Sequence, residues 1–175
     1  MASYESLIRK VAKISGIAPE LLAAHIMAES RFDPNATYRD TDGVRSYGLM
    51  QLRIDTARKM LNEPSLTPTM LLVPETNVMA GARYLQKSFA RWPNLKDTIA
   101  SYNAGVPRKN ILGQYVNSKG VPNVQKYVDK VYGYYQEYMK GKPLAPLKSF
   151  QKSGLASLLF IVGLLGLGLI WIEKK

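Results

Sequence analysis

Residues 19–32 read PELLAAHIMAESRF, and this stretch predicts the helix on which the rest of the fold depends. Pro19 suits the first turn of a helix, because that position needs no backbone N–H for an internal hydrogen bond. Leu22, Ile26 and Glu29 follow at helical spacing, so they share the face that turns towards the core. The sequence therefore places one carboxyl group on an otherwise apolar face, near the end of a buried helix.

Outward from this helix, the chain reads as mainly helical. The helix itself should end near Phe32, because the residue before Pro34 disfavours helical geometry. Apolar residues at helical spacing predict further helices over residues 4–14, 55–61, 75–91, 95–102 and 124–139. Polar stretches rich in Gly, Pro, Asn and Asp predict a loop or short hairpin over 35–47, a brief strand or turn at 48–52, and loops over 62–74 and 106–122.

The C-terminal part carries an apolar run, SGLASLLFIVGLLGLGLIWI at residues 153–172, without a charged residue. About 20 apolar residues suffice for a helix to cross a hydrocarbon core. The expected fold class is thus a mainly α globular domain with little β structure, plus one C-terminal transmembrane helix. The expected division is a domain over 1–140, a linker over 141–152, the span over 153–172 and a charged tail over 173–175.

The two ends of the chain also predict its placement. The N-terminus has no apolar region typical of a secretory signal, and lysines precede the apolar run. The positive-inside bias then favours a cytoplasmic side for the globular part. The expectation is a single-pass, membrane-anchored protein.

Composition excludes several kinds of chemistry. The 175 residues include no Cys and a single His, His25, so disulfides, thiolate nucleophiles and the usual zinc ligand sets are not expected. No metal or cofactor is predicted. The net charge of +11 favours an anionic partner, but the basic residues are dispersed, so specific nucleic-acid binding is not expected.

Glu29 is the strongest candidate for chemistry. Burial on the core-facing side removes water from the carboxyl group and raises its pKa, so that it can hold a proton and donate it to a leaving oxygen. The alternative is a structural role, in which Glu29 caps the helix or pairs with Arg31 or His25.

Two further segments offer groups that could contact a substrate. In residues 46–51, SYGLMQ, Gly48 next to Gln51 could admit a ligand to backbone and amide, or the segment is a tight turn followed by core residues. In residues 100–105, ASYNAG, Tyr102 and Asn103 offer a phenol and an amide at a helix end, or they merely end the helix.

Taken together, four segments resemble the soluble-lytic-transglycosylase (goose-lysozyme-like) family in content, order and spacing, over roughly residues 5–138. They are Glu29-Ser30-x-Phe32, Gly-Leu-Met-Gln at 48–51, Tyr-Asn-Ala-Gly at 102–105 and Tyr127-Val128-x-x-Val131. The resemblance implies a lysozyme-like, mostly helical fold.

The resemblance also implies roles for single residues. Glu29 matches the catalytic acid/base, and the expected substrate-binding or site-supporting residues are Ser30, Ser46, Gln51, Tyr102, Asn103 and Tyr127. Two departures stand out. Leu52-Arg53-Ile54 replaces an apolar Ile-Met-Pro run found in many members, so Arg53 is expected to alter a sugar subsite or meet an acidic group of the wall peptide. Ser101 replaces an Ala.

The implied activity is peptidoglycan lytic transglycosylation. The β-1,4 bond between N-acetylmuramic acid and N-acetylglucosamine is cut and a 1,6-anhydro sugar forms, which requires one enzyme carboxyl group rather than the usual pair. A hydrolytic muramidase is the alternative if Asp33, Asp40 or Asp42 holds a water molecule. A non-enzymatic wall-binding membrane or assembly protein is a further alternative.

These readings predict a biological setting. The expected location is the virion membrane of a phage, where the enzyme opens the cell wall locally during genome delivery, with the bacterial inner membrane as the alternative. The expected partners are peptidoglycan glycan strands, a lipid bilayer through residues 153–172 and virion proteins.

Overall fold

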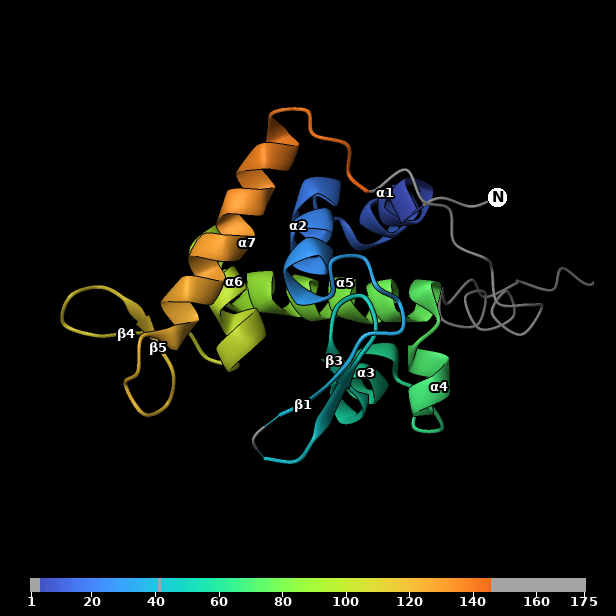
Figure 1. The fold of residues 1–175 in the computed structure, drawn as a ribbon, viewed down its shortest axis with the longest axis horizontal. Coiled ribbons are helices and arrows are strands. Elements are labelled where there is room, and N and C mark those ends of the chain that lie inside the picture. Colours follow the sequence, from blue (N-terminus) through green and yellow to red (C-terminus); the bar gives the residue numbers. More distant parts are fainter. Residues whose placement is uncertain (1–3, 41, 146–175) are drawn as a thin grey trace, which may run out of the picture.

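A computed structural model describes residues 4–40 and 42–145 (Figure 1). The helices are α1 (Tyr4–Ser15), α2 (Pro19–Glu29), α3 (Ile54–Leu61), α4 (Pro68–Leu71), α5 (Pro74–Arg91), α6 (Leu95–Ala104) and α7 (Asn123–Met139). The strands are β1 (Thr37–Arg39), β2 (Arg45–Tyr47), β3 (Leu52–Arg53), β4 (Arg108–Lys109) and β5 (Tyr115–Val116). Helices dominate and the strands are short, so the mainly α prediction with little β is confirmed.

Helix α2 lies in the middle of the core. Residues 21–26 are all buried, because α2 is apolar around most of its circumference and neighbouring helices cover it. It packs against α1 and α7, and α7 also contacts α6 (Figure 1). The carboxyl end of α2 is thereby held among elements that come from distant parts of the chain.

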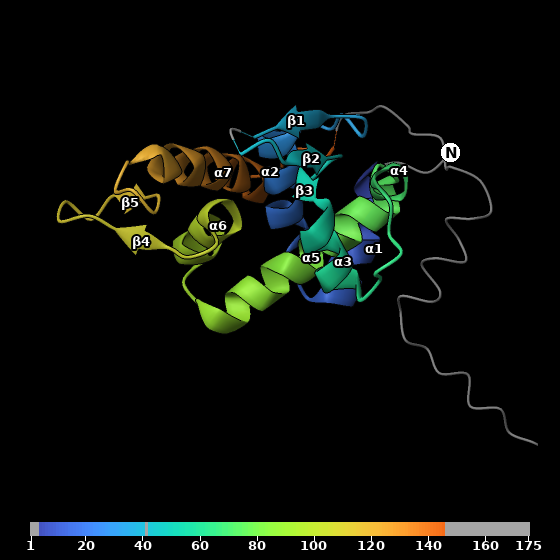
Figure 2. The ribbon, with the colours of Figure 1, turned by 90° about the horizontal axis from the view of Figure 1, so that it is seen from below.

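The strands β1, β2 and β3 form a small antiparallel sheet in that order, which lies along one side of the helices in Figure 2. Tyr38 pairs with Ser46, and Ser46 pairs with Arg53. Of the two possibilities expected over 35–47, a loop or a short hairpin, the structure has the hairpin. Of the brief strand or turn expected at 48–52, residues 48–51 form a turn, and β3 begins at Leu52. The predicted loop over 106–122 contains a second hairpin, β4–β5.

A buried asparagine ties the turn at 48–51 to α5. The Asn77 side chain accepts a hydrogen bond from the Met50 N–H at 2.7 Å and donates to the carbonyls of Tyr47 and Leu71 at 2.8 and 2.9 Å. Gly48 has a φ of +74°, and a Cβ there would lie 2.9 Å from Asn77 Cγ. Glycine is therefore required at this position, both for the backbone and for the close approach.

Two local predictions were wrong. Helix α4 lies within the predicted loop over 62–74: Pro68 stands in its first turn, and the Thr67 hydroxyl accepts from the Met70 N–H at 3.3 Å. Helix α2 ends at Glu29 rather than near Phe32. The left-handed backbone of Arg31 and Phe32 returns the Phe32 ring to the core, 5.8 Å from the ring of Tyr4.

The fold-class prediction is corrected in its second part. Among the helices of residues 4–40 and 42–145, none is long and apolar enough to cross a membrane. The longest, α5 and α7, have 18 and 17 residues and each carries several charged side chains, whereas a span needs about 20 apolar residues. The run over 153–172 lies outside the described residues. The fold is a mainly helical domain with two small sheets.

Candidate active site

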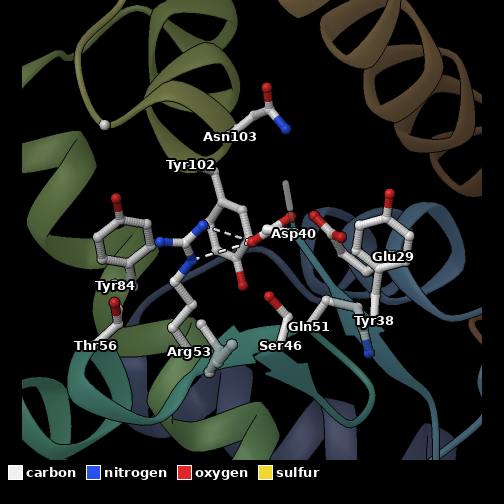
Figure 3. A pocket seen from close by; sticks show the side chains of 12 residues that line it. Glu29, Tyr38, Asp40, Ser46, Gln51, Arg53, Thr56, Tyr84, Tyr102 and Asn103 are labelled. Carbon is white, nitrogen blue, oxygen red and sulfur yellow. Dashed lines mark hydrogen bonds and ion pairs between the residues drawn. The ribbon is translucent and has the colours of Figure 1, made fainter. Parts of the chain in front are cut away.

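A cleft of about 660 Å³ opens where the β1–β3 sheet faces α6 and the end of α2 (Figure 3). Its lining combines carboxylates, hydroxyls, amides and aromatic rings, so the cleft is polar rather than apolar. The lining residues are Glu29, Tyr38, Asp40, Ser46, Gln51, Leu52, Arg53, Thr56, Tyr84, Tyr102, Asn103 and Gly105. Such a surface suits a ligand that is rich in hydroxyl and amide groups.

Glu29 is the last residue of α2 and is only partly exposed in this cleft. The Tyr127 hydroxyl of α7 donates to Glu29 Oε1 at 2.5 Å. Burial raises the pKa of Glu29 from 4.5 to about 7, against the opposing effects of the Tyr127 hydrogen bond and the positive charge of Lys130. The negative charge of Asp40 raises this pKa further. The carboxyl group can therefore both release and accept a proton near neutral pH.

Partly buried tyrosines lie near the carboxyl group. The Tyr102 hydroxyl donates to the Met50 carbonyl at 2.9 Å, and the Tyr84 ring lies edge-on to the Tyr102 ring at 5.2 Å. Burial raises the pKa of both Tyr102 and Tyr127 well above the ordinary value for a phenol. These hydroxyls therefore stay protonated and act as fixed hydrogen-bond donors.

Arg53 lines the cleft as a paired cation. Its guanidinium donates to Asp40 Oδ2 at 2.6 and 3.1 Å, and its Nη1 lies 2.8 Å from Asp42 Oδ2. The ion pairs tie β3 to the β1–β2 hairpin on one wall of the cleft (Figure 3). The charge of Arg53 is thus largely balanced by the hairpin, and Asp40 faces the cleft with its carboxylate already engaged.

The structure brings most of the predicted site residues together. One cleft is lined by Glu29, Ser46, Gln51, Tyr102 and Asn103. Their contacts with a substrate stay predictions. Gln51 also has a structural bond, since its amide nitrogen donates to the carbonyls of Ala36 and Gly48, each at 2.9 Å.

Tyr127 and Ser30 stand outside the lining. Tyr127 reaches Glu29 from α7 and donates to its carboxyl group. The Ser30 hydroxyl donates to the Leu49 carbonyl at 2.9 Å, so it joins the end of α2 to the turn at 48–51. This contact places Ser30 in support of the site rather than in the cleft.

Three lining residues were missed: Tyr38, Thr56 and Tyr84. Tyr38 belongs to a stretch that was expected only as a polar loop or hairpin. Tyr84 lies on α5 beside the apolar stripe that packs into the core, so its sequence position carries no signal of a cleft.

Asp33, one of the three acids considered as a partner for Glu29, is a turn residue: its side chain accepts a hydrogen bond from the Asn35 N–H at 2.9 Å. No group of three or more metal-ligating side chains occurs within the described part of the chain.

Comparisons with known proteins agree with this geometry. The chain is 31% identical over 153 residues to the membrane-bound lytic murein transglycosylase F of Desulfosudis oleivorans, covering 75% of this chain and 32% of the relative. It is 30% identical over 159 residues to the soluble lytic murein transglycosylase of Escherichia coli K12, covering 81% and 24%. It is 32% identical over 92 residues to a transglycosylase of Enterobacteria phage PRD1, covering 53% and 31%.

A solved structure has the same fold. The complex of the 70-kDa soluble lytic transglycosylase with bulgecin A matches with a TM-score of 0.63 and 28% identity, covering 86% of this chain and 26% of that one. The lysozyme-like part of the predicted fold is thereby confirmed. The chain spans a third or less of the length of these relatives.

The prediction of a single-pass, membrane-anchored location is corrected, because none of the helices in the described residues is long and apolar enough to cross a membrane. The physical reason is that every helix of the described fold has a face committed to the protein core. The apolar run that led to this prediction lies outside the described residues.

The family itself follows from a match across most of the chain. The sequence model of the transglycosylase SLT domain matches residues 6–124. That range contains the end of α2 with Glu29, the turn at 48–51 and the end of α6, which are the elements that build the cleft. The chain belongs to the transglycosylase SLT domain family.

Proposed function

We propose that this chain is a peptidoglycan lytic transglycosylase that cuts the β-1,4 bond between N-acetylmuramic acid and N-acetylglucosamine. The observation that carries the proposal is the Glu29 carboxyl group, whose pKa is raised to about 7 by burial at the edge of a polar cleft. Family membership and the lytic murein transglycosylases among the relatives support the substrate class.

The proposed reaction uses Glu29 twice. Protonated Glu29 donates to the glycosidic oxygen as the bond from that oxygen to C1 of the muramic acid breaks, and the sugar's own N-acetyl group stabilises the cation at C1. The Glu29 carboxylate then accepts the proton of the muramic acid 6-hydroxyl, whose oxygen attacks C1. The products are a 1,6-anhydro sugar and a free 4-hydroxyl, no water is consumed, and Glu29 is protonated again.

The proposed roles of the other residues follow from their positions. Ser46, Gln51 and Asn103 line the cleft and are proposed to bind hydroxyl and N-acetyl groups of the glycan. Tyr102 is proposed to form the wall next to the reacting bond. Ser30 and Tyr127 hold the end of α2 and the Glu29 carboxyl group in place.

Digestion of purified cell walls followed by mass spectrometry of the fragments tests the proposal. The wild-type chain should release anhydro-muropeptides, and Glu29→Gln should release about a hundredfold to ten-thousandfold less, because the acid is lost while its shape is kept. Wall binding without any cleavage by the wild type would instead favour a non-enzymatic wall-binding protein. Matching circular dichroism spectra of the two proteins serve as the control.

A hydrolytic muramidase is the second candidate, because Asp40 lines the same cleft and acts electrostatically on Glu29. Its carboxylate is held by Arg53, which leaves it poorly placed to activate water. Fragments that end in reducing muramic acid, and that disappear in Asp40→Asn, would favour hydrolysis. Anhydro ends that persist in Asp40→Asn support transglycosylation.

The phage relative supports a proposed biological role, in which the enzyme opens the cell wall locally while a phage delivers its genome. Residues 1–140 are the proposed catalytic unit, and peptidoglycan glycan strands are the proposed partner. Contacts with virion proteins remain a prediction from the sequence.

A further inference from the structure

A buried histidine stands behind the proposed acid. His25 is the single histidine of the chain and lies one helical turn before Glu29 on α2. Its side chain is fully buried, and Nδ1 lies 3.1 Å from the Tyr127 hydroxyl. The same hydroxyl donates to Glu29 Oε1 at 2.5 Å. The three groups therefore form a continuous chain of hydrogen bonds that ends at the carboxyl group.

Counting protons along this chain assigns the tautomer of His25. A tyrosine hydroxyl has one proton, and Tyr127 gives it to Glu29, so the Tyr127 oxygen is left to accept from His25. Burial lowers the pKa of His25 to about 3, so the ring is neutral and carries a single N–H. That N–H belongs on Nδ1, where it has an acceptor.

The environment of the other ring nitrogen agrees with this tautomer. His25 Nε2 is buried and has no hydrogen-bond partner among the residues that the structure describes. A proton on Nε2 would leave a buried N–H without an acceptor and would take the Tyr127 proton away from Glu29. With the proton on Nδ1, only a lone pair on Nε2 is left unpaired. No buried N–H then lacks an acceptor, and the Tyr127 proton stays on Glu29.

We infer that His25 is a positioning residue for the proposed reaction: it donates from Nδ1 to Tyr127, holds the Tyr127 proton on Glu29 Oε1, and so confines the transferable proton of Glu29 to Oε2. The inference rests on the proposed function and deepens it. With Oε1 always an acceptor, the acid donates and recovers its proton at one oxygen. This differs from a purely structural histidine, whose hydrogen bond would have no effect on the ionisation of Glu29.

The other groups near Glu29 do not duplicate this role. Lys130 of α7 donates to the Ala28 carbonyl at 2.6 Å, and Asp40 at the end of β1 is bound by Arg53. The Tyr102 hydroxyl of α6 is committed to the Met50 carbonyl. The His25 ring packs against the Tyr102 ring at 4.6 Å, which holds the imidazole edge towards Tyr127.

Two variants whose side chains have the same number and branching of heavy atoms separate the hydrogen bond from the packing. In His25→Asn the side-chain amide can occupy the place of Nδ1 and donate to Tyr127. In His25→Leu a side chain of similar shape cannot donate. Both lose the imidazole ring, and they differ in whether the side chain can donate to Tyr127.

The expected results differ in a way that packing does not predict. His25→Leu should lower kcat on purified walls by about tenfold with little change in KM, and His25→Asn should stay within about threefold of the wild type. In His25→Leu the Tyr127 hydroxyl still donates to Glu29, but it loses the donor that polarises it, so this hydrogen bond weakens. Because the Tyr127 hydrogen bond lowers the pKa of Glu29, its weakening should shift the alkaline limb of the pH profile to higher pH. Equal kcat values and equal pH profiles for the two variants would overturn the inference.

A spectroscopic measurement on the wild type needs neither activity nor a variant that folds. A tag-free protein labelled with ¹⁵N-histidine gives one imidazole spin system, since the chain has one histidine. The inference expects a neutral ring protonated at Nδ1 throughout about pH 5 to 8. A proton on Nε2, or titration of the ring in this range, would overturn it. Failure of the wild type to cut walls refutes the proposed reaction, whereas the tautomer is measured without substrate.

Discussion

A carboxyl group changes its chemistry when water is taken from it, and Glu29 shows this at the scale of a single residue. Its side chain ends a buried helix and meets a tyrosine hydroxyl instead of bulk solvent. The neutral form is thereby favoured and the pKa rises to about 7. At a second position, 48, only glycine fits. Its backbone is left-handed, and the Asn77 amide leaves no room for a side chain.

The raised pKa of Glu29 predicts a stability that falls with pH. Between 4.5 and about 7 the folded chain binds a proton that the unfolded chain has lost, so the free energy of unfolding decreases as pH rises through this range. Glu29→Gln mimics the protonated form and removes the effect. By chemical denaturation, the variant should be more stable than the wild type at pH 8 by up to about 3 kcal/mol, and equal to it at pH 4. Equal stabilities at pH 8 would contradict this prediction.

Gly48→Ala should destabilise the chain by about 2–4 kcal/mol, because the new Cβ would overlap the Asn77 side chain and the φ of +74° disfavours alanine. Gly113→Ala is the matched control. Its φ is +75°, but no atom lies within 4 Å of the added Cβ, so about 1 kcal/mol is expected. Thermal denaturation of both variants measures the difference, and similar losses would show that backbone strain alone is at work.

At the scale of elements, the cleft depends on short connections between segments that are far apart in sequence. The turn at 48–51 is held to α5 by Asn77, to α2 by Ser30 and to α6 by Tyr102. Each connection uses a side chain to satisfy a backbone group that the turn cannot satisfy itself. The turn is irregular, yet it is held on three sides.

Asn77→Ala should therefore cost about 3 kcal/mol or more, because it removes the side chain that hydrogen-bonds three backbone groups, two of them in buried contacts. The wall-cutting activity should fall together with stability, since the turn carries Gln51 into the cleft. Asn94→Ala is the comparison: Asn94 caps α6 by accepting from two exposed N–H groups, and about 1 kcal/mol is expected. Urea denaturation measures both, and an equal loss in the two variants would disprove the special role of Asn77.

For the molecule as a whole, charge supplies a longer-range interaction. The chain carries a net charge of +11, and bacterial walls contain acidic groups. The basic residues are dispersed along the sequence, and Arg53 in the cleft is already paired. The overall field therefore favours approach to an anionic polymer, whereas the cleft itself selects by hydrogen bonds.

Wall binding should consequently weaken with salt. In sedimentation of the Glu29→Gln variant with purified walls, raising NaCl from about 0.05 to 0.5 M should reduce the bound fraction at least about fivefold, because surface charges are screened. Binding that is unchanged by salt would show that the cleft alone retains the wall. The melting temperature at both salt concentrations serves as the control for folding.

The sequence by itself determined the helices, the central apolar helix, the position of Glu29 and the segments that gather around it. These features are local, because helical spacing, turn residues and short motifs depend on residues that are close together in the sequence. The mainly helical part of the fold class could be predicted for the same reason. The expected transmembrane helix has no counterpart among the described helices, and helix α4 was missed because a single turn is too short to show periodicity.

Only the tertiary structure decided which groups meet. The bonds from Tyr127 to Glu29 and His25 join residues about a hundred positions apart. The pairing of Arg53 with Asp40 and the bond of Ser30 to the Leu49 carbonyl also depend on how α2, α7 and the strands cross. Tyr38 and Tyr84 enter the cleft for the same reason. Local propensity cannot encode such contacts, because their energy depends on distance in space, burial and the path of the whole chain.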